Sequence, residues 1–276
     1  MFACLEEGIR IYMNRINKKF IELKKKGRKA FIAFITAGYP GLAMTARLVL
    51  ELEKRGVDII ELGVPFSDPL ADGPVIQEAS LYSLKKGTNL VKILDLVKSL
   101  RKETDLPICL MSYYNPIFCL GDKKFVDRAI AAGVDGVIIP DLPPEEAKEF
   151  IRYSNKQGLA NICFLAPTSS QERIKAISKI ARGFIYYVSL TGVTGSRKNL
   201  AADLRSNLAK ISKVARVPVC AGFGISSADQ LRQVQKICDG GIVGSAIVNK
   251  IRENINHKDL VKRVGSFVEG FNVQKK

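Results

Sequence analysis

The sequence has no tryptophan and one histidine, His257. Transition-metal sites in proteins usually take several histidine or cysteine ligands at close spacing. Six cysteines are present, but no two of them form a CxxC pair. We therefore expect no metal site in this chain, and we expect His257 to be a solvated residue of a terminal helix.

Long apolar runs are absent as well. No stretch of about 18 apolar residues occurs, which is what a membrane-spanning helix requires. The first residues include Glu6 and Glu7 and do not have the pattern of a secretory signal or a transit peptide. Cys109, Cys163 and Cys220 stand in apolar runs, which is typical of reduced thiols in a core. We expect a cytoplasmic location, or the plastid stroma if the protein is encoded in that organelle.

Acidic residues are few compared with basic ones. Forty-three Lys and Arg oppose 27 Asp and Glu, so the formal net charge is +16. A nucleic-acid-binding protein would explain this charge, but the basic residues are spread along the chain, and no basic run alternates with aromatic residues or carries a known nucleic-acid-binding motif. We expect no nucleic-acid partner. A positive field that attracts a phosphorylated substrate is the milder interpretation.

Eight short apolar runs recur along the chain. They are continuous rather than alternating, which is typical of parallel strands that are buried on both faces. Segments with helical periodicity lie between them. The expected strands are residues 31–36, 58–63, 107–111, 136–140, 161–166, 184–189, 218–221 and 241–243, and the expected helices include 43–55, 124–132, 145–156, 171–182, 200–214 and 228–238.

This order predicts the fold. Eight βα units within about 250 residues are the pattern of a (β/α)₈ TIM barrel. An open doubly wound sheet is the alternative, although it more often has five or six strands. An extra helix over 4–26 has an apolar stripe that could cap the bottom of the barrel. We predict a single α/β domain over 1–276, with the capping helix in 1–28 and the barrel in 29–270.

One carboxylate stands inside an apolar strand. Glu61 lies between Ile60 and Leu62, and no expected strand carries a Lys or Arg to pair with it. Burying a carboxylate is costly unless the group is paired or protonated. Because burial raises a carboxyl pKa toward neutrality, Glu61 is a candidate for proton transfer. A salt bridge to a neighbouring strand is the structural alternative.

The loop after that strand holds two more acidic residues. Asp72 stands among Pro and Gly residues, where Asp is also an ordinary turn residue. Its place near the same strand end as Glu61 makes it the second catalytic candidate. Asp68 could instead cap the loop or contact a partner protein.

Glycine-rich loops follow the last three expected strands, at 191–196, 222–226 and 244–247. Glycine permits close approach of backbone to a ligand, and free N–H groups at a helix start bind anions. In barrels the usual phosphate site lies after strands seven and eight. No strand lysine is available for a Schiff base, and no Walker or GxSxG motif occurs. Carboxylate acid–base chemistry on a phosphorylated small molecule remains.

Residues 61–74, ELGVPFSDPLADGP, resemble the signature of tryptophan synthase α subunits. Further stretches agree in order, and the resemblance extends from about residue 20 to about residue 270. It implies a lyase (EC 4.2.1.20) of tryptophan biosynthesis that cleaves indole-3-glycerol phosphate to indole and D-glyceraldehyde 3-phosphate by a retro-aldol reaction. The further stretches are residues 37–41, 111–116, 140–143, 192–195, 222–226 and 244–245.

The resemblance also implies roles for individual residues. Glu61 would protonate the indole ring at C3, and Asp72 would accept a hydrogen bond from the indole N–H and stabilise the developing positive charge. Glu61 or a substrate oxygen would be the base in the cleavage step. The remaining substrate contacts would be Phe34, Tyr113 and Tyr186 for the indole, and Thr194, Gly195, Phe223, Gly224, Gly244 and Ser245 toward the phosphate.

Members of this family work as an α₂β₂ complex. Indole passes through a tunnel to a β subunit, whose pyridoxal phosphate joins it to serine, so this chain would carry no cofactor. The resemblance suggests Asp68, Pro69 and Asn115 as interface residues. The loop with Asp68 and the loop 190–199 would close over substrate; Leu190 stands where some members carry Arg. The alternatives are a stand-alone lyase that releases free indole and a non-catalytic phosphosugar-binding barrel.

Overall fold

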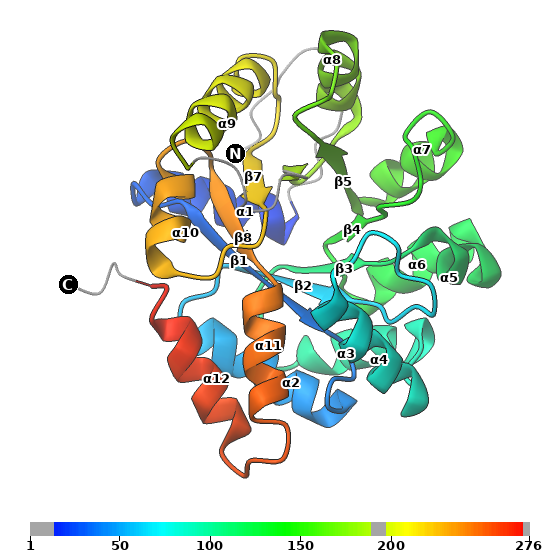
Figure 1. Ribbon diagram of the computed structural model, residues 1–276. Coiled ribbons are helices and arrows are strands. Elements are labelled where there is room, and N and C mark those ends of the chain that lie inside the picture. Colours follow the sequence, from blue (N-terminus) through cyan, green and yellow to red (C-terminus); the bar gives the residue numbers. More distant parts are fainter. Residues whose placement is uncertain (1–13, 189–196, 273–276) are drawn as a thin grey trace.

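Eight parallel strands close into a barrel in chain order, with β1 beside β8 (Figure 1). The computed structural model describes residues 14–188 and 197–272, and only the backbone over 197–204. The strands are β1 (Ala30–Thr36), β2 (Ile59–Gly63), β3 (Ile108–Met111), β4 (Gly136–Ile138), β5 (Ala160–Leu165), β6 (Ile185–Val188), β7 (Val219–Gly222) and β8 (Gly240–Val243). The TIM-barrel prediction is confirmed, and the closing β1–β8 pair excludes an open sheet.

Helices surround the barrel (Figure 1). The six helices expected between strands are present with their ends shifted by a few residues, and the wide gap after β2 holds two helices rather than one. The helices are α1 (Arg15–Lys25), α2 (Leu42–Lys54), α3 (Pro74–Lys85), α4 (Leu90–Leu100), α5 (Tyr114–Leu120), α6 (Asp122–Ala132), α7 (Lys148–Gln157), α8 (Gln171–Ile180), α9 (Arg197–Ser212), α10 (Ala228–Gln235), α11 (Ser245–Glu253) and α12 (Leu260–Glu269).

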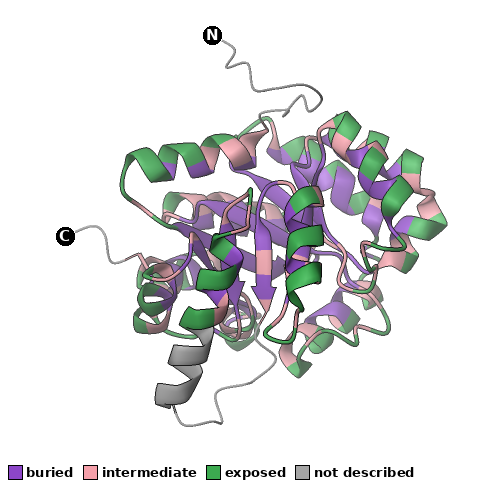
Figure 2. Cartoon of the chain, turned by 90° about the horizontal axis from the view of Figure 1, so that it is seen from above, coloured by how far each residue is buried: buried purple, intermediate pink, exposed green. Residues whose placement is uncertain are grey.

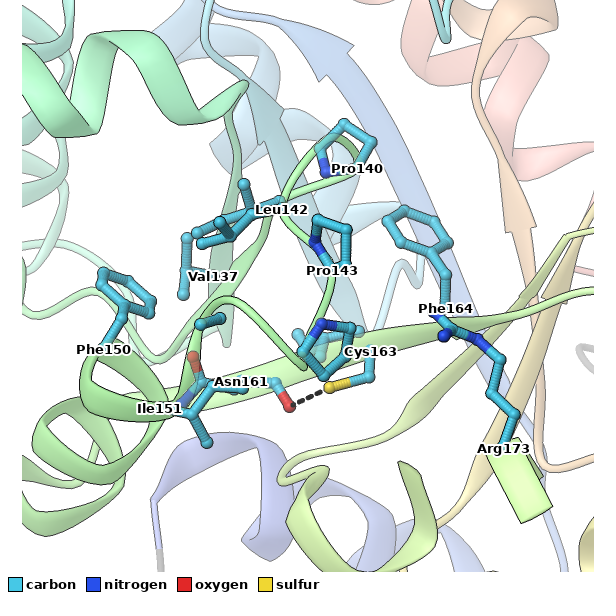
Figure 3. A pocket seen from close by; sticks show the side chains of 14 residues that line it. Val137, Pro140, Leu142, Pro143, Phe150, Ile151, Asn161, Cys163, Phe164 and Arg173 are labelled. Atoms are coloured by element: carbon cyan, nitrogen blue, oxygen red, sulfur yellow. Dashed lines mark hydrogen bonds between the residues drawn. The ribbon is translucent and has the colours of Figure 1, made fainter. Parts of the chain in front are cut away.

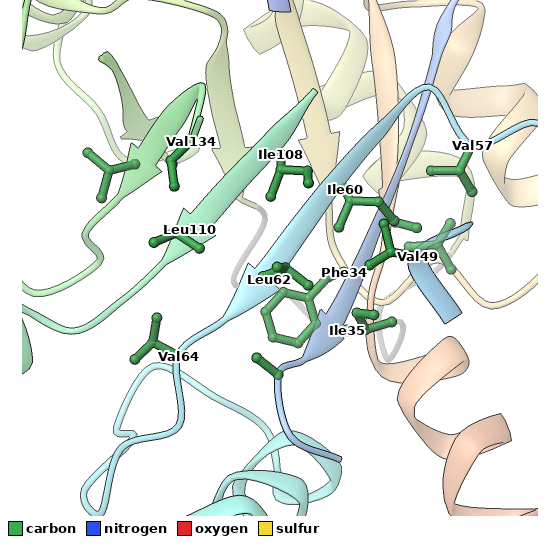
Figure 4. Packing of buried hydrophobic residues seen from close by; sticks show 14 of the residues in the cluster. Phe34, Ile35, Val49, Val57, Ile60, Leu62, Val64, Ile108, Leu110 and Val134 are labelled. Atoms are coloured by element: carbon green, nitrogen blue, oxygen red, sulfur yellow. The ribbon is translucent and has the colours of Figure 1, made fainter. Parts of the chain in front are cut away.

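Strand side chains alternate between the helix layer and the barrel interior. Ile60 and Leu62 of β2 pack with Ile108 and Leu110 of β3 in the layer beneath the helices (Figure 4). Viewed from above, buried residues fill the central strands and exposed residues cover the outer helix faces (Figure 2). Because both faces of the sheet are covered, the strands read as continuous apolar runs.

Helix α1 closes the bottom of the barrel. Its buried residues Ile16, Phe20 and Leu23 pack against the interior residues Ile59 and Phe184 at the start of the strands. The side chain of the N-cap residue accepts a hydrogen bond from the first turn. The predicted cap is confirmed over Arg15–Lys25, while residues 1–13 lie outside the described part of the chain.

Three aspartates at the bottom of the barrel share one arrangement. Each stands directly before a strand, and its side chain accepts a hydrogen bond from a backbone N–H of the neighbouring strand. Asp58 accepts from Phe31 at 2.9 Å, Asp135 accepts from Ile108 at 2.9 Å, and Asp239 accepts from Val219 at 3.0 Å. Each is also paired with a cation. These contacts help to set the register at which adjacent strands begin.

The expectation that His257 lies in a terminal helix is wrong. Helix α11 ends at Glu253 and α12 begins at Leu260, so His257 lies in the turn between them. Its Nδ1 accepts the backbone N–H of Asp259 at 3.0 Å, which fixes the ring against the turn. Among the described residues no group of His, Cys, Asp or Glu is arranged to hold a metal ion. None of the helices described is both long and apolar enough to cross a membrane.

Candidate active site

A cavity of about 540 Å³ opens at the carboxyl ends of the strands. Residues far apart in the chain line it, among them Phe34, Asp72, Tyr186, Gly224 and Ser245. The volume lies within the range of small-molecule sites. Barrel enzymes place their active site at this end, in the loops that follow the strands.

Glu61 points into the barrel rather than toward the helices. Successive side chains of a strand point to opposite faces of the sheet, so Glu61 points to the same face as Ile59, two residues before it. Ile59 belongs to the interior cluster, whereas Ile60 and Leu62 belong to the outer layer. In the β1–β2 pairing it stands beside Phe34, which lines the cavity, but Glu61 itself is not among the residues that border the cavity. The side chain is fully buried, and in the described part of the chain neither carboxyl oxygen has a hydrogen-bond partner.

This isolation determines the protonation of Glu61. Burial raises the pKa of the carboxyl group from 4.5 to about 8, because neither a cation nor a hydrogen-bond donor compensates for the lost hydration. At neutral pH the group holds its proton. Burial raises the pKa of Tyr186 as well, and the charge that Glu61 carries once it is ionised acts in the same direction.

Asp72 stands at the edge of the same cavity, in the loop before α3. Its Oδ2 accepts a hydrogen bond from the Tyr113 hydroxyl at 3.2 Å, and its backbone carbonyl accepts one from Gln77 at 3.0 Å. Burial raises the pKa of Asp72 to about 6, and the Tyr113 hydrogen bond acts in the opposite direction. At neutral pH Asp72 is mainly ionised, so the two carboxyl groups are in opposite protonation states.

Tyr113 has a different place from the one expected. It is not among the residues that border the cavity; its ring stacks on Phe66, with centroids 5.1 Å apart. The hydroxyl oxygen accepts the N–H of Ala71 at 2.9 Å and donates to Asp72. Tyr113 therefore joins the start of α5 to the loop after β2 and positions the Asp72 carboxylate.

Phe34 and Tyr186 do line the cavity, and two glycines make room for their rings. A Cβ on Gly63 would stand 2.5 Å from the Phe34 ring, and one on Gly222 would stand 2.7 Å from the Tyr186 hydroxyl oxygen. Neither glycine has an unusual backbone angle that requires it, so close packing of the aromatic rings explains both. Sequence analysis had treated Gly222 only as part of a phosphate loop.

The predicted phosphate residues that the structure describes lie together. Phe223, Gly224, Gly244 and Ser245 all line the cavity. Gly224 has a φ of +75°, a conformation that favours glycine, and Gly244 is the N-cap of α11. The first amide groups of a helix have no partner within it, and the residues at the start of α11, Gly244 and Ser245, border this end of the cavity. Thr194 and Gly195 lie outside the described residues.

Sequence analysis missed Arg173. This residue lies in the first turn of α8, lines the cavity, and forms an ion pair with Glu145 at 2.9 Å. Together with Pro140 and Phe164 it also borders a smaller cavity of about 120 Å³ between β5 and the loop after β4 (Figure 3). A basic residue in the first helical turn after a strand end was the available signal.

The predicted interface residues are accessible. Asp68 and Asn115 are exposed, and Pro69 is partly exposed. Two large apolar side chains close to them in sequence are exposed as well: Leu70 is 93% exposed and Phe118 is 66% exposed. The Tyr113 hydroxyl holds the two segments together. Leu70 also lines the cavity, so this exposed surface reaches the cavity at that residue.

Known proteins resemble this chain over nearly its full length. The sequence profile of the family described as tryptophan synthase alpha chain matches residues 20–275. The tryptophan synthase alpha chain of Geobacter sulfurreducens is 52% identical over 256 residues, which cover 93% of this chain and 97% of that protein. The corresponding protein of Geotalea daltonii is 50% identical, with the same coverage.

Solved structures agree. Tryptophan synthase subunit alpha of Legionella pneumophila superposes with a TM-score of 0.88 at 39% identity, covering 94% of this chain and 97% of that one. A chain from a structural study of the tryptophan synthase a2b2 complex of Pyrococcus furiosus superposes with a TM-score of 0.81 at 36% identity, covering 88% of this chain and 97% of that one. On sequence and structure together, this chain belongs to the tryptophan synthase alpha chain family.

Proposed function

We propose that the cavity binds indole-3-glycerol phosphate and that Glu61 and Asp72 carry out its cleavage. The chain is a lyase of tryptophan biosynthesis that converts this substrate to indole and D-glyceraldehyde 3-phosphate, as its family membership establishes. The assignment of these roles rests on two carboxyl groups near one apolar cavity, of which one is protonated and the other ionised at neutral pH. One group, Glu61, can donate a proton, and the other, Asp72, can accept a hydrogen bond at the same pH.

The reaction begins with proton transfer. Glu61 gives its proton to C3 of the indole ring, and the ring nitrogen takes up the positive charge of the indolenine tautomer. Asp72 accepts a hydrogen bond from the ring N–H and stabilises that charge, which is larger in the transition state than in the substrate. Tyr113 keeps the Asp72 carboxylate in place through the hydrogen bond already described.

Cleavage then restores the neutral ring. The glycerol hydroxyl next to the ring loses its proton, a carbonyl forms at that carbon, and the carbon–carbon bond to C3 breaks. The bonding electrons return to the indole ring and neutralise its nitrogen. The released proton goes to the Glu61 carboxylate or to a substrate oxygen. The products are indole and an aldehyde that keeps its phosphate. The enzyme returns to its initial state directly when Glu61 takes the released proton, and otherwise after Glu61 takes a proton from solvent.

The lining of the cavity supports this orientation of substrate. Phe34 and Tyr186 provide apolar faces for an indole ring on the side of Glu61 and Asp72. The amide groups at Gly224 and at the start of α11 fit a phosphate on the opposite rim. Thr194 and Gly195 are proposed as further phosphate contacts from the family resemblance alone.

We propose a β subunit as the physiological partner in an α₂β₂ tetramer. Structures of tryptophan synthase complexes, including that of P. furiosus, are among the structural relatives. Asp68, Pro69 and Asn115 would contact this partner, and pyridoxal phosphate would be bound there rather than in this chain. Indole would then pass to the partner instead of being released, in the cytoplasm. The names of the relatives favour this arrangement over a stand-alone lyase.

Replacement of Glu61 by glutamine tests the assignment. Glu61→Gln retains the size of the side chain but removes the transferable proton, so we expect kcat for indole formation to fall by about 10³-fold or more while substrate still binds. Glu53→Gln, on α2 and away from the cavity, is the matched control and should keep full activity. Turnover by Glu61→Gln within a few fold of the wild type would reject the role.

A further inference from the structure

A second cavity, of about 800 Å³, lies at the opposite end of the barrel from the active site. Helix α1 forms one wall with Phe20 and Lys24. The other walls come from the end of α8, the segment after α9, Val219 at the start of β7 and Asp239 just before β8. The cavity is therefore built at the bottom of the barrel, where the chemistry described above has no part.

Positive charge is concentrated around this cavity. Six basic side chains line it and Asp239 is its one acidic residue; the basic residues are Lys24, Arg28, Lys29, Lys179, Arg182 and Arg216. Asp239 is already engaged, because it pairs with Lys29 at 3.0 Å and accepts the Val219 N–H at 3.0 Å. Arg28 approaches Asp58 at 3.6 Å.

The other cations are less well compensated. Within the described ranges, Lys24, Lys179 and Arg216 form no ion pair, and all three are exposed. They come from three separate elements, α1, α8 and the segment between α9 and β7, yet border one cavity. Like charges that converge in this way repel one another, and an anion between them would relieve the repulsion.

The wall between the cations is apolar. Phe20, Ile21, Val217 and Pro218 contribute to it, and Ile21 is 46% exposed although it is a large aliphatic residue. Ile21 and Lys24 are three residues apart on α1, so they lie on one face of that helix. The cavity thus combines an apolar surface with convergent positive charge, and its volume suits a drug-sized ligand.

We propose that this cavity is a binding site for a small organic polyanion of the nucleoside di- or triphosphate class. The phosphates would lie among Lys24, Lys179 and Arg216, and the ring system would lie against Ile21 and Val217. Inorganic phosphate would leave the apolar wall exposed to water. A nucleic-acid backbone would need a strip of cations along an open surface, whereas here they surround a cavity.

Calorimetric titration of the full chain with ATP tests the proposal. EDTA removes divalent ions, and saturating glycerol 3-phosphate occupies the phosphate site of the active-site cavity. We expect one ATP to bind per chain. The triple variant Lys24→Gln, Lys179→Gln, Arg216→Gln should bind at least about tenfold more weakly, equivalent to about 1.4 kcal/mol. Inorganic pyrophosphate should bind the wild type about tenfold more weakly than ATP does.

The matched control removes the same amount of charge elsewhere. Lys85, Lys98 and Lys156 are exposed, lie outside the cavity, and have no ion pair within the described residues. Their triple replacement by Gln should change ATP affinity by less than about twofold, with both variants showing wild-type circular dichroism and melting.

Several results would overturn the proposal. One is the absence of ATP binding at about 1 mM, since a Kd of that size corresponds to a binding free energy of only about 4 kcal/mol. The others are an equal loss of affinity in both triple variants and displacement of ATP by glycerol 3-phosphate. Pyrophosphate binding as tight as that of ATP would contradict the role of the apolar wall. Tighter binding of duplex RNA or DNA than of ATP, lost in the same variant, would identify a nucleic-acid site instead.

Discussion

The two ends of the barrel surround buried carboxyl groups with different partners. At the bottom, Asp135 accepts the Ile108 N–H at 2.9 Å and pairs with Arg101 at 2.7 Å. Burial raises its pKa overall, and the arginine and the N–H act against that rise. At the top, Glu61 has no such partner in the described residues. The environment, rather than the residue type, separates a structural carboxylate from a proton donor.

The largest expected effect concerns the pH dependence of stability at Glu61. The pKa rises from 4.5 in the unfolded chain to about 8 in the folded protein, so the folded state binds more protons between these values. Stability should therefore fall as pH rises from about 4.5 to about 8, by roughly 5 kcal/mol at most. Urea unfolding across this range should show the decline in the wild type and lack this component in Glu61→Gln. Parallel curves for the two proteins would contradict it.

Loss of the paired carboxylate should destabilise the bottom of the barrel at every pH above the acid range. Asp135→Asn leaves the Arg101 guanidinium, whose side chain is 10% exposed, without its anion. We expect a loss of about 3 kcal/mol in the free energy of unfolding, with unchanged turnover per folded molecule. Asp105→Asn is the control, since that carboxylate is 94% exposed and should cost less than about 1 kcal/mol. Similar losses in both variants would show that burial of the pair is unimportant.

The two active-site carboxyl groups predict a bell-shaped pH profile. The ratio kcat/KM should rise through about pH 6 as Asp72 ionises and fall through about pH 8 as Glu61 loses its proton. Outside this window the rate should change about tenfold, or 1.4 kcal/mol, per pH unit. Asp72→Asn should lower the rate and abolish the acid limb only. If that limb persists in the variant, another group is responsible for it.

The smallest effect is expected at Tyr113. Tyr113→Phe removes the hydroxyl that joins Ala71 to Asp72 but leaves the ring stacked on Phe66. We expect about 1 kcal/mol, which is a five- to tenfold decrease in kcat, together with a small upward shift of the acid limb. Tyr153→Phe, at an exposed hydrogen bond to Asp127, is the control. A change in KM alone would indicate that Tyr113 binds substrate directly.

Much of the fold could be predicted from the sequence, because strands buried on both faces leave continuous apolar runs. Glu61 was identifiable for the same reason, since a lone carboxylate interrupts such a run. The role of Tyr113 was not, because it depends on a contact between residues 41 positions apart. The turn that holds His257 likewise depends on packing between elements that no local pattern records. Arg173 differs, because a basic residue in the first helical turn after a strand end is a local signal.

The proposed catalysis depends on the proton that Glu61 retains at neutral pH. The direct measurement is a titration of its carboxyl carbon by ¹³C NMR, with the resonance assigned by its loss in Glu61→Gln. A midpoint near pH 8 is predicted, because nothing in the described structure compensates for the burial of this group. A midpoint near 4.5, the ordinary value for glutamate, would contradict the proposed proton donor.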